Sequence, residues 1–576
     1  MIKSFFIKHE WLSILLLSIV FICIRLPGTS LPLHQDEYKW PDIANPAHYS
    51  EVGIPHPPLS EFIYRTAGYI VGYDTDFRFV PLFFGTINLV LLYYFMRIVW
   101  GRREAVIACL IWIFSYFSVL ASLMVDTDGQ VMPFFFLIAL ISYYKIRPES
   151  SYTRNFSWKW LGILILACLG GFLVKVSFLL AVAAIFADFL WLKKNIFDRK
   201  IIIKYVSYGL SVVIGLIIIL FLMKYIFPFF NLDKSLKYWL HFISADRGWF
   251  QTIIQCIKAL LYASPFLVLV PFLNKKQDIS LARPFVFFLV FSFIFYIVLF
   301  DFSIGALDRY LQLIILPLTV FCAIAVSYLL KIEDKYSKKY LKISLIAGLL
   351  LVLIFILLQF VYHYVPTLHP KTEWISRIIS FRWNFVYPFS GGSGPLGFYV
   401  SFLFMALSWL TSLIAVILGI WKPAFRKFVL IFLIPIGIAY NGVFIEEYIF
   451  GVINGSASRL LINTVEFIKN DTNIIRVNPY NDNGGNEIRE IGKYGRRLYI
   501  DPKFETDPQS VLDNLNLHKE HYLVINIPRF SPDSVQQRFF DTCRIVYMEN
   551  DKKISSVVYD CRRAPDIKKQ KKHKQR

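Results

Sequence analysis

Residues 1–454 alternate between long apolar stretches and short polar ones. The apolar stretches are continuously hydrophobic, whereas the strands of a membrane β-barrel alternate apolar and polar positions. Crossing the hydrocarbon core of a bilayer takes about 20 residues of α-helix, which most of these stretches supply. The pattern predicts a polytopic α-helical membrane protein with about 13 transmembrane helices. The predicted spans are 11–27, 79–99, 105–124, 131–146, 159–174, 176–192, 204–223, 252–273, 284–300, 310–330, 341–361, 396–418 and 428–447.

Polar connections set the predicted topology. With the N-terminus inside, Lys and Arg concentrate in the cytoplasmic connections, as the positive-inside rule requires. The first loop, residues 28–78, is then external. Residues 158–192 could form one long tilted helix or two short spans, and we predict two because the charge alternation downstream then stays in phase. Arg25 and Pro27 stand where small residues should precede a signal-peptide cleavage site, so the first helix is predicted to be uncleaved.

Composition agrees with a membrane protein. The chain is 56% hydrophobic and 18% aromatic, as expected where rings pack against lipid and sit at the interfaces. The net charge of +21 could suggest nucleic acid, but the basic residues fall mostly between apolar runs and serve as a topology signal. We therefore predict membrane lipids as partners and no nucleic acid. Short loops and compact length favour a bacterial inner membrane.

Residues 455–576 are polar and contain strand-like stretches separated by Asn, Asp, Gly and Pro. This pattern predicts a small soluble α/β domain after a transmembrane domain at 1–454. An odd number of spans places the domain outside the cytoplasm. The basic tail KKQKKHKQR argues for the other side, but long domains translocate largely regardless of charge.

Two cysteines close to the C-terminus support an external domain. Folding residues 543–561 as a hairpin about Asp551 to Lys553 pairs Arg544 with Asp560, Val546 with Val558, and Cys543 with Cys561. Cβ atoms at directly opposite positions lie about 4.5–5.5 Å apart, close to disulfide range. A Cys543–Cys561 disulfide in an oxidising compartment is predicted, with two unrelated buried thiols as the alternative. The other five cysteines lie in apolar spans and are interpreted as small hydrophobic residues.

The external ends of the spans gather groups suited to one kind of chemistry. Asp36 and Glu37 are adjacent acids next to a membrane bundle, where charges are costly and usually functional. A carboxylate facing an acceptor hydroxyl can act as general base, and nearby cations can hold a departing phosphate. No P-loop, dinucleotide fingerprint, zinc-spaced set or nucleophile elbow occurs, and the glycines at 391–394 are interpreted as a loop hinge. Further candidates on the same membrane face are Asp126, Asp128, Lys175, Arg309 and Tyr310.

Each candidate also has a structural interpretation. Lys175 could extend its ammonium group to the membrane interface, although it lies far from any polar loop in GGFLVKVSFLL. Asp308 and Arg309 could form an ion pair at a helix start. Either Asp126 or Asp128 could cap the N-terminus of the fourth span, where an acid is favoured. The Asp36–Glu37 pair is the one that structure alone explains least.

Several motifs together resemble the GT-C superfamily, and within it the protein O-mannosyltransferases and bacterial aminoarabinose lipid A transferases. The resemblance covers most of residues 1–330 and becomes faint beyond them. No single motif is specific, but their order and spacing match. The motifs are the first-loop Asp-Glu pair, HPPL at 56–59, the Arg-Arg turn at 102–103, TDGQVMPFFFLIAL, GGFLVKVSFLL and DRYLQLIILPL.

The resemblance implies an inverting glycosyltransferase that uses a polyprenyl-phosphate-linked sugar on the external face. It implies that Asp36 is the base with Glu37 beside it, and that Asp128, or else Asp126, matches the acid before span four. It further implies that Lys175 and Arg309 hold the donor phosphate, while His56 contacts substrate. Relatives often carry Lys-Gly-Pro where this chain has Lys175-Val176-Ser177, which predicts a softer helix break. A divalent cation bound by the acids is left open.

Nucleotide sugars are cytoplasmic, so outward-facing acids would need a sugar carried across on a lipid. We expect a lipid-lined groove beside the first loop, roofed by an amphipathic helix near Leu59 to Val71. In this helix Phe62, Ile63, Tyr69 and Ile70 are predicted to face lipid, while Glu61 and Arg65 face water. The alternatives are a transporter or flippase of lipid-linked glycans, which would place its charges near the membrane midplane, and a non-catalytic glycan-binding protein. The sequence offers few midplane acids beyond Asp188.

Overall fold

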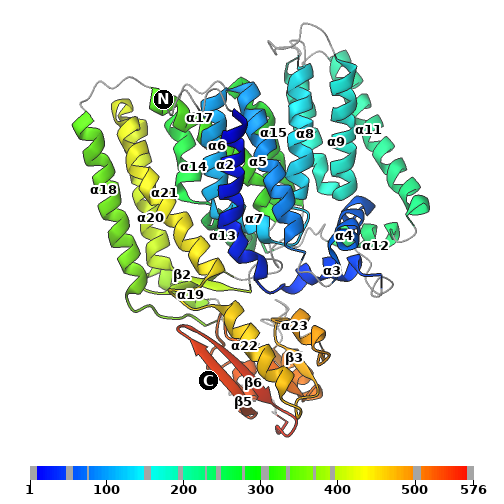
Figure 1. Cartoon of the computed structure of the whole chain (residues 1–576), viewed down its shortest axis with the longest axis vertical. Coiled ribbons are helices and arrows are strands. Elements are labelled where there is room, and N and C mark those ends of the chain that lie inside the picture. Colours follow the sequence, from blue (N-terminus) through cyan, green and yellow to red (C-terminus); the bar gives the residue numbers. More distant parts are fainter. Residues whose placement is uncertain are drawn as a thin grey trace, which may run out of the picture. The chain divides into compact units, whose positions relative to one another are not determined.

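The structure is a computed structural model, and the chain divides into two compact units (Figure 1). Unit 1 comprises Met1–Thr29, Lys39–Gly348 and Ser412–Ile438, and unit 2 comprises Ser30–Tyr38, Leu349–Thr411 and Ala439–Arg576. The first-loop acids therefore belong to the unit that contains the C-terminal region. The described residues are 10–46, 56–73, 77–147, 157–192, 199–227, 230–241, 248–274, 279–299, 310–331, 338–367, 372–389, 396–496 and 508–566.

Apolar helices dominate the described residues. Eight are long and apolar enough to cross a membrane, two further segments are bent helix pairs, and three are shorter apolar helices. All the predicted spans coincide with one of these segments, which confirms a multi-pass α-helical membrane protein. How many of them cross the bilayer stays a prediction. The segments contain α2 (Glu10–Arg25), α5 (Phe79–Val99), α6 (Arg102–Phe114), α7 (Tyr116–Leu123), α8 (Val131–Ile146), α9 (Trp158–Val174), α10 (Leu179–Trp191), α11 (Arg199–Ile226), α13 (Trp249–Tyr262), α14 (Pro265–Leu269), α15 (Arg283–Phe293), α17 (Ile315–Lys331), α18 (Lys338–Leu357), α20 (Phe402–Trp421) and α21 (Arg426–Ile449).

Two segment boundaries are informative. Residues 158–192 form two helices, α9 and α10, that are separated at Lys175, as predicted. The span predicted at 396–418 begins later, at Phe402, because Phe398–Ser401 forms strand β2. Strand β2 pairs antiparallel with β1 (Val386–Phe389), and this hairpin was not predicted.

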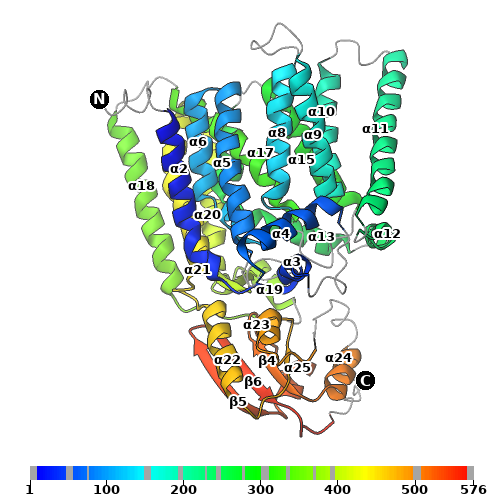
Figure 2. The same ribbon diagram turned by 45° about the vertical axis from the view of Figure 1, so that its right-hand side comes forward.

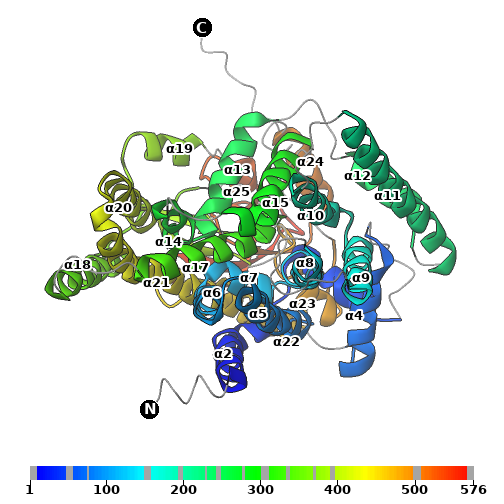
Figure 3. The same cartoon turned by 90° about the horizontal axis from the view of Figure 1, so that it is seen from above.

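The helices of unit 1 pack side by side, and Figure 3 shows several of them end-on. Helix α5 packs against α6 and α8, and α8 packs against α9. Helix α4 (Pro58–Val71) lies crosswise to α5 and α8 in Figure 2 and contacts α9. Its residue range confirms the helix predicted near Leu59 to Val71, while its role as the roof of a lipid-lined groove stays a prediction.

The exposed side of α4 is apolar. Phe62, Tyr69 and Ile70 are exposed, as predicted for a helix that lies against lipid. The prediction for Glu61 is wrong: it is buried and forms an ion pair with Arg65 at 2.6 Å. The carboxylate points inward because residues 61, 64 and 68 form the packed face of this helix.

Unit 2 contains a four-stranded sheet in the order β3-β4-β6-β5, which confirms a small C-terminal α/β region. Strands β3 and β4 are parallel, and the other pairs are antiparallel. Alternate residues of β4 pack on opposite faces, Leu523 in the core that includes α22 and Tyr522 in the core that includes α25. The elements are β3 (Val477–Pro479), β4 (His521–Ile525), β5 (Arg544–Asp551), β6 (Ile554–Asp560), α22 (Ala457–Asn470), α23 (Gly485–Glu490), α24 (Pro508–Leu517) and α25 (Val535–Phe540).

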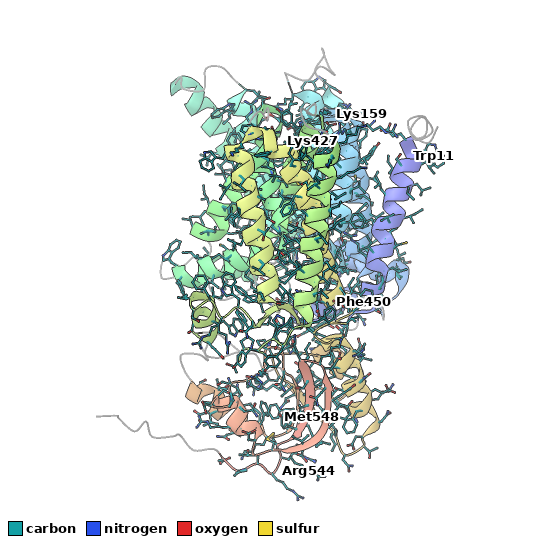
Figure 4. All side chains as sticks on the ribbon, turned by 90° about the vertical axis from the view of Figure 1, so that its left-hand side faces the viewer. Trp11, Lys159, Lys427, Phe450, Arg544 and Met548 are labelled. Carbon is teal, nitrogen blue, oxygen red and sulfur yellow. A yellow bond between two sulfur atoms is a disulfide. The ribbon has the colours of Figure 1, made fainter. Side chains whose placement is uncertain are left out.

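Strands β5 and β6 form the predicted hairpin with one irregularity. Arg544 pairs with Asp560 as predicted, but Val546 does not pair with Val558, because a bulge places Tyr547 opposite Val558. The disulfide Cys543–Cys561 is present, with the Cα atoms 4.6 Å apart, which confirms that prediction. Figure 4 labels Arg544 and Met548, which are exposed on β5. The strand-like residues 497–500 and the glycines at 391–394 lie outside the described residues.

Candidate active site

The adjacent acids of the first loop lie on a short 3-10 turn, Gln35–Tyr38, in unit 2. Glu37 is fully buried, and its Oε2 accepts a hydrogen bond from the His34 backbone amide at 2.9 Å. The Glu37 amide in turn donates to the His34 carbonyl at 3.0 Å. Glu37 therefore closes the turn, whereas Asp36 is the carboxylate of the pair that retains partial exposure.

The other two predicted acids lie in unit 1, between α7 and α8. Oδ1 of Asp126 accepts from the Thr127 amide at 2.6 Å, and the Asp126 carbonyl accepts from the Tyr64 hydroxyl at 3.1 Å. Asp128 is fully buried. The N-cap of α8 is Gln130, without a side-chain capping bond, so the interpretation of either acid as the cap of this helix is wrong. The Asp126 carboxylate is thus bonded to the backbone of its own loop, and the Asp128 carboxylate is buried.

Buried polar side chains fix the ends of this loop. The Arg78 guanidinium donates to the Leu123 carbonyl at the C-terminus of α7, where unsatisfied carbonyls attract a cation. Asn88 on α5 donates to the backbone and side-chain oxygens of Gln130, at 2.7 and 2.9 Å. Arg78, Asn88 and Gln130 were not predicted from the sequence. The pattern that could have indicated them is a polar side chain within or beside a strongly apolar run.

Lys175 joins the Asp128 carboxylate in the interior of unit 1. Its backbone is extended (φ −157°, ψ 134°) between α9 and the 3-10 turn Val176–Phe178, so the helix break persists without the Gly-Pro of relatives. The side chain is mostly buried, and its ammonium forms an ion pair with Asp128. The nitrogen also lies 4.7 Å from the centroid of the Tyr310 ring. The interpretation of Lys175 as an interfacial lysine is therefore wrong.

Three predicted site residues, Asp128, Lys175 and Tyr310, thus meet in one cluster. The Tyr310 ring stacks on Tyr296 at 5.9 Å between centroids, which fixes its orientation over the ammonium. A cation over an aromatic face is stabilised by the ring quadrupole, most strongly where water is excluded. The cluster therefore holds the Lys175 ammonium at a defined place, between the Asp128 carboxylate and the Tyr310 ring.

His56 ends an aromatic stack in the same unit. Its ring lies parallel to Trp40, with 6.0 Å between centroids, and Trp40 stacks on Tyr64 at 4.5 Å. Tyr64 bonds to the Asp126 carbonyl, so the stack connects His56 to the loop of the buried acids. A substrate contact for His56 stays a prediction.

Several predictions about the site remain open. Arg309 and Asp308 lie outside the described residues. The chamber predicted to hold Asp36 together with Lys175 stays a prediction, because the two residues belong to different units. Within the described ranges, no group of three or more His, Cys, Asp or Glu side chains could hold a metal ion, and a divalent cation likewise stays untested.

Comparisons with known proteins agree with the predicted resemblance. The model of the dolichyl-phosphate-mannose-protein mannosyltransferase family matches residues 55–226. A search of curated proteins gave no sequence match.

Solved structures match over nearly the whole chain. ArnT from Cupriavidus metallidurans bound to undecaprenyl phosphate is 14% identical, with a TM-score of 0.51, covering 96% of this chain and 98% of that one. The apo structure of the same enzyme is 12% identical with the same TM-score and coverage. The archaeal oligosaccharyltransferase AglB from Archaeoglobus fulgidus, in complex with an inhibitory peptide and a dolichol-phosphate, is 11% identical with a TM-score of 0.44, covering 90% and 69%. The chain therefore has the fold of the GT-C membrane glycosyltransferases, as the motifs of its first 330 residues predicted.

Proposed function

We propose that the protein is an inverting glycosyltransferase that moves a sugar from a polyprenyl-phosphate donor to an acceptor outside the cytoplasm. The observation that carries the proposal is the first-loop turn, on which Glu37 is buried in a bond to the His34 amide while Asp36 stays partly exposed. The likeness of the fold to an ArnT structure that holds undecaprenyl phosphate supports a lipid-phosphate donor.

In the proposed reaction, Asp36 is the general base. Its carboxylate takes the proton of the acceptor hydroxyl, and the hydroxyl oxygen attacks the anomeric carbon from the face opposite the phosphate. The bond between the anomeric carbon and the phosphate oxygen breaks, and the electron pair leaves with the polyprenyl phosphate. One displacement inverts the anomeric configuration. Because the phosphate is a stable anion, the leaving group needs cations and no strong acid.

Lys175 is proposed to supply a cation to that phosphate. Its ammonium group is already held by Asp128 and by the face of Tyr310, so the side chain has a fixed position without the donor. A fixed positive charge in an environment that excludes water stabilises developing negative charge far more than the same charge in water. Arg309, one residue before Tyr310, is proposed as a second cation.

The donor would reach the site from the bilayer. The exposed apolar residues of α4 suit a helix lying in the interface, next to a polyprenyl chain. The acceptor could be a glycan, a lipid or a protein, and a bacterial inner membrane is the proposed location. Asp188, the acid that stood out within the spans, is fully buried and ion-paired with Arg147 and Arg283, as a structural charge would be, and so gives no support to a transporter.

The test uses membranes that contain the full chain, incubated with labelled polyprenyl-phosphate sugars. Wild-type membranes should label one acceptor fraction, and Asp36→Asn should abolish labelling at equal expression. Asp533→Asn makes the same change at an exposed carboxylate of unit 2 and should label normally. Near-normal transfer by Asp36→Asn would exclude Asp36 as the base, and movement of an intact lipid-linked glycan without transfer would favour the flippase.

A further inference from the structure

The turn that carries Asp36, Gln35–Tyr38, has a backbone conformation that is unfavourable without contacts to other segments. It is four residues long, and a single helical turn is unfavourable alone because few hydrogen bonds offset the ordered backbone. Gln35 also has a positive φ of 46°, which is unfavourable for a non-glycine residue. Such a conformation persists only when surrounding groups hold it.

Three side chains of this segment contact three consecutive residues of the C-terminal region, all within unit 2. His34 Nε2 lies 3.1 Å from Asn483 Oδ1, and the Gln35 amide donates to the Asn481 carbonyl at 3.2 Å. The Tyr38 hydroxyl donates to Asp482 Oδ2 at 3.0 Å. These contacts flank Asp36 on both sides in sequence.

The loop at 481–483 is itself firmly built. Asn481 and Asp482 both have a φ of 57°, a conformation that Asn and Asp tolerate better than most residues. The Tyr480 amide bonds to the Leu523 carbonyl on β4, which ties the loop to the sheet. Gly484 has a φ of 81°, a conformation that glycine adopts without strain and that L side chains rarely adopt. The loop is thus attached directly to the C-terminal sheet.

The Tyr38–Asp482 contact joins two buried side chains and is the contact that follows Asp36 in sequence. A buried hydrogen bond is costly to break, because the partner left behind has no water to bond to. The Arg489 guanidinium lies 4.9 Å from the centroid of the Tyr38 ring and holds the ring from another side. Tyr38 is therefore fixed two residues after Asp36.

We propose that the loop Asn481–Asn483 positions Asp36 for proton transfer, with Tyr38 and Asp482 as the central pair. The inference rests on the proposed function, because it assigns to the C-terminal region a part in orienting the base. A positioning residue does not touch the substrate. Its loss should lower kcat and leave the KM for the lipid donor unchanged, since a misplacement of about 1 Å can cost on the order of a hundredfold in rate.

The experiment compares four variants of the full chain in lipid nanodiscs: Tyr38→Phe, Asp482→Ala, the double variant and Asp482→Asn. We expect each of the first two to lower kcat about tenfold or more, with unchanged donor KM. The double variant should lose no more than either single variant, because both break the same contact. Asp482→Asn keeps an oxygen that can accept from Tyr38 and should restore most of kcat. Asn486→Ala, which removes a bond to Glu490 on α23, is the matched control and should behave as wild type.

A second measurement does not depend on activity. Hydrogen exchange of residues 31–38 should become at least about tenfold faster in Asp482→Ala and stay unchanged in Asn486→Ala, because the Glu37 amide would lose its protection. Unchanged exchange, unchanged kcat or additive losses in the double variant would each overturn the positioning role. A wild type that transfers no sugar from any polyprenyl-phosphate donor would refute the proposed function instead, and the exchange result would still decide whether the loop holds the turn.

Discussion

Lys175 forms an ion pair with the buried carboxylate of Asp128 in the interior of the helical unit 1. A buried ion pair is far more favourable than either charge alone, because an unpaired buried charge keeps the whole desolvation penalty without a compensating attraction. The pair therefore has two separable properties, a contribution to folding and a proposed contribution to donor binding.

Lys175→Met should lower both the stability of the protein and its binding of the lipid donor. The change keeps the length of the side chain but removes the ammonium group that pairs with Asp128, which we expect to cost about 3–5 kcal/mol of stability. Donor use should fall as well, since the proposed phosphate contact is gone. Thermal unfolding in detergent and the donor KM of the transfer assay measure the two effects.

The double variant Lys175→Met with Asp128→Asn separates them. Stability should largely recover because no unpaired charge remains, whereas donor use should stay low. Full recovery of donor use would show that Lys175 has only a structural role.

A second buried network, around Asp188 on α10, should matter for folding alone. Asp188 accepts from Tyr143 at 2.6 Å and is ion-paired with Arg283 at 3.0 Å and with Arg147 at 3.4 Å. Asp188→Ala removes the carboxylate that pairs with both arginines and should lower stability by about 3–5 kcal/mol. Transfer per folded molecule should not change. A selective loss of transfer in well-folded Asp188→Ala protein would revive the interpretation of this acid as part of a substrate path.

The disulfide Cys543–Cys561 should stabilise the C-terminal sheet. The double variant Cys543→Ser with Cys561→Ser should lose about 2–4 kcal/mol, because the bond restricts the unfolded chain. Reductant should lower the unfolding midpoint of the wild type and leave that of the variant unchanged. A non-reducing peptide map without the cross-linked peptide would contradict the bond itself.

Glu61 on α4 should make stability depend on pH. Burial raises the pKa of its carboxyl from 4.5 to about 7, although Arg65 opposes the shift. Between these values the folded protein binds more protons than the unfolded chain, so stability should fall as pH rises from about 4.5 to 7 and level off above. Glu61→Gln should remove this part of the profile. Thermal midpoints between pH 5 and 8 test it, with Glu466→Gln, an exposed carboxylate on α22, as the control.

Patterns local in sequence predicted most of the fold. The apolar runs located all the candidate membrane segments of the described residues, because burial in lipid imposes a length and a composition that are visible in the sequence. The hairpin and its disulfide followed from alternation and cysteine spacing. The bulge at Val546 and the start of α20 at Phe402 were missed, because each depends on how one strand pairs with the next, which the apolar pattern does not show.

The site was only partly predictable. Lys175 and Asp128 stood out as charges in apolar surroundings, and the structure pairs them. Glu37 looked equivalent to Asp36 in the sequence, and burial distinguishes them. The partners of Tyr38 could not be predicted, because an Asn-Asp-Asn run indicates a turn but does not say which distant segment the turn will contact.

The contacts of that turn also set an order of events during synthesis. His34, Gln35 and Tyr38 bond to residues that follow them by 449, 446 and 444 positions. A ribosome has therefore made most of the protein before the turn meets its partners. A nascent or prematurely terminated chain would already carry its membrane helices, yet the turn with the proposed base Asp36 would still be unrestrained. The proposed transfer activity would then arise only with the last part of the polypeptide.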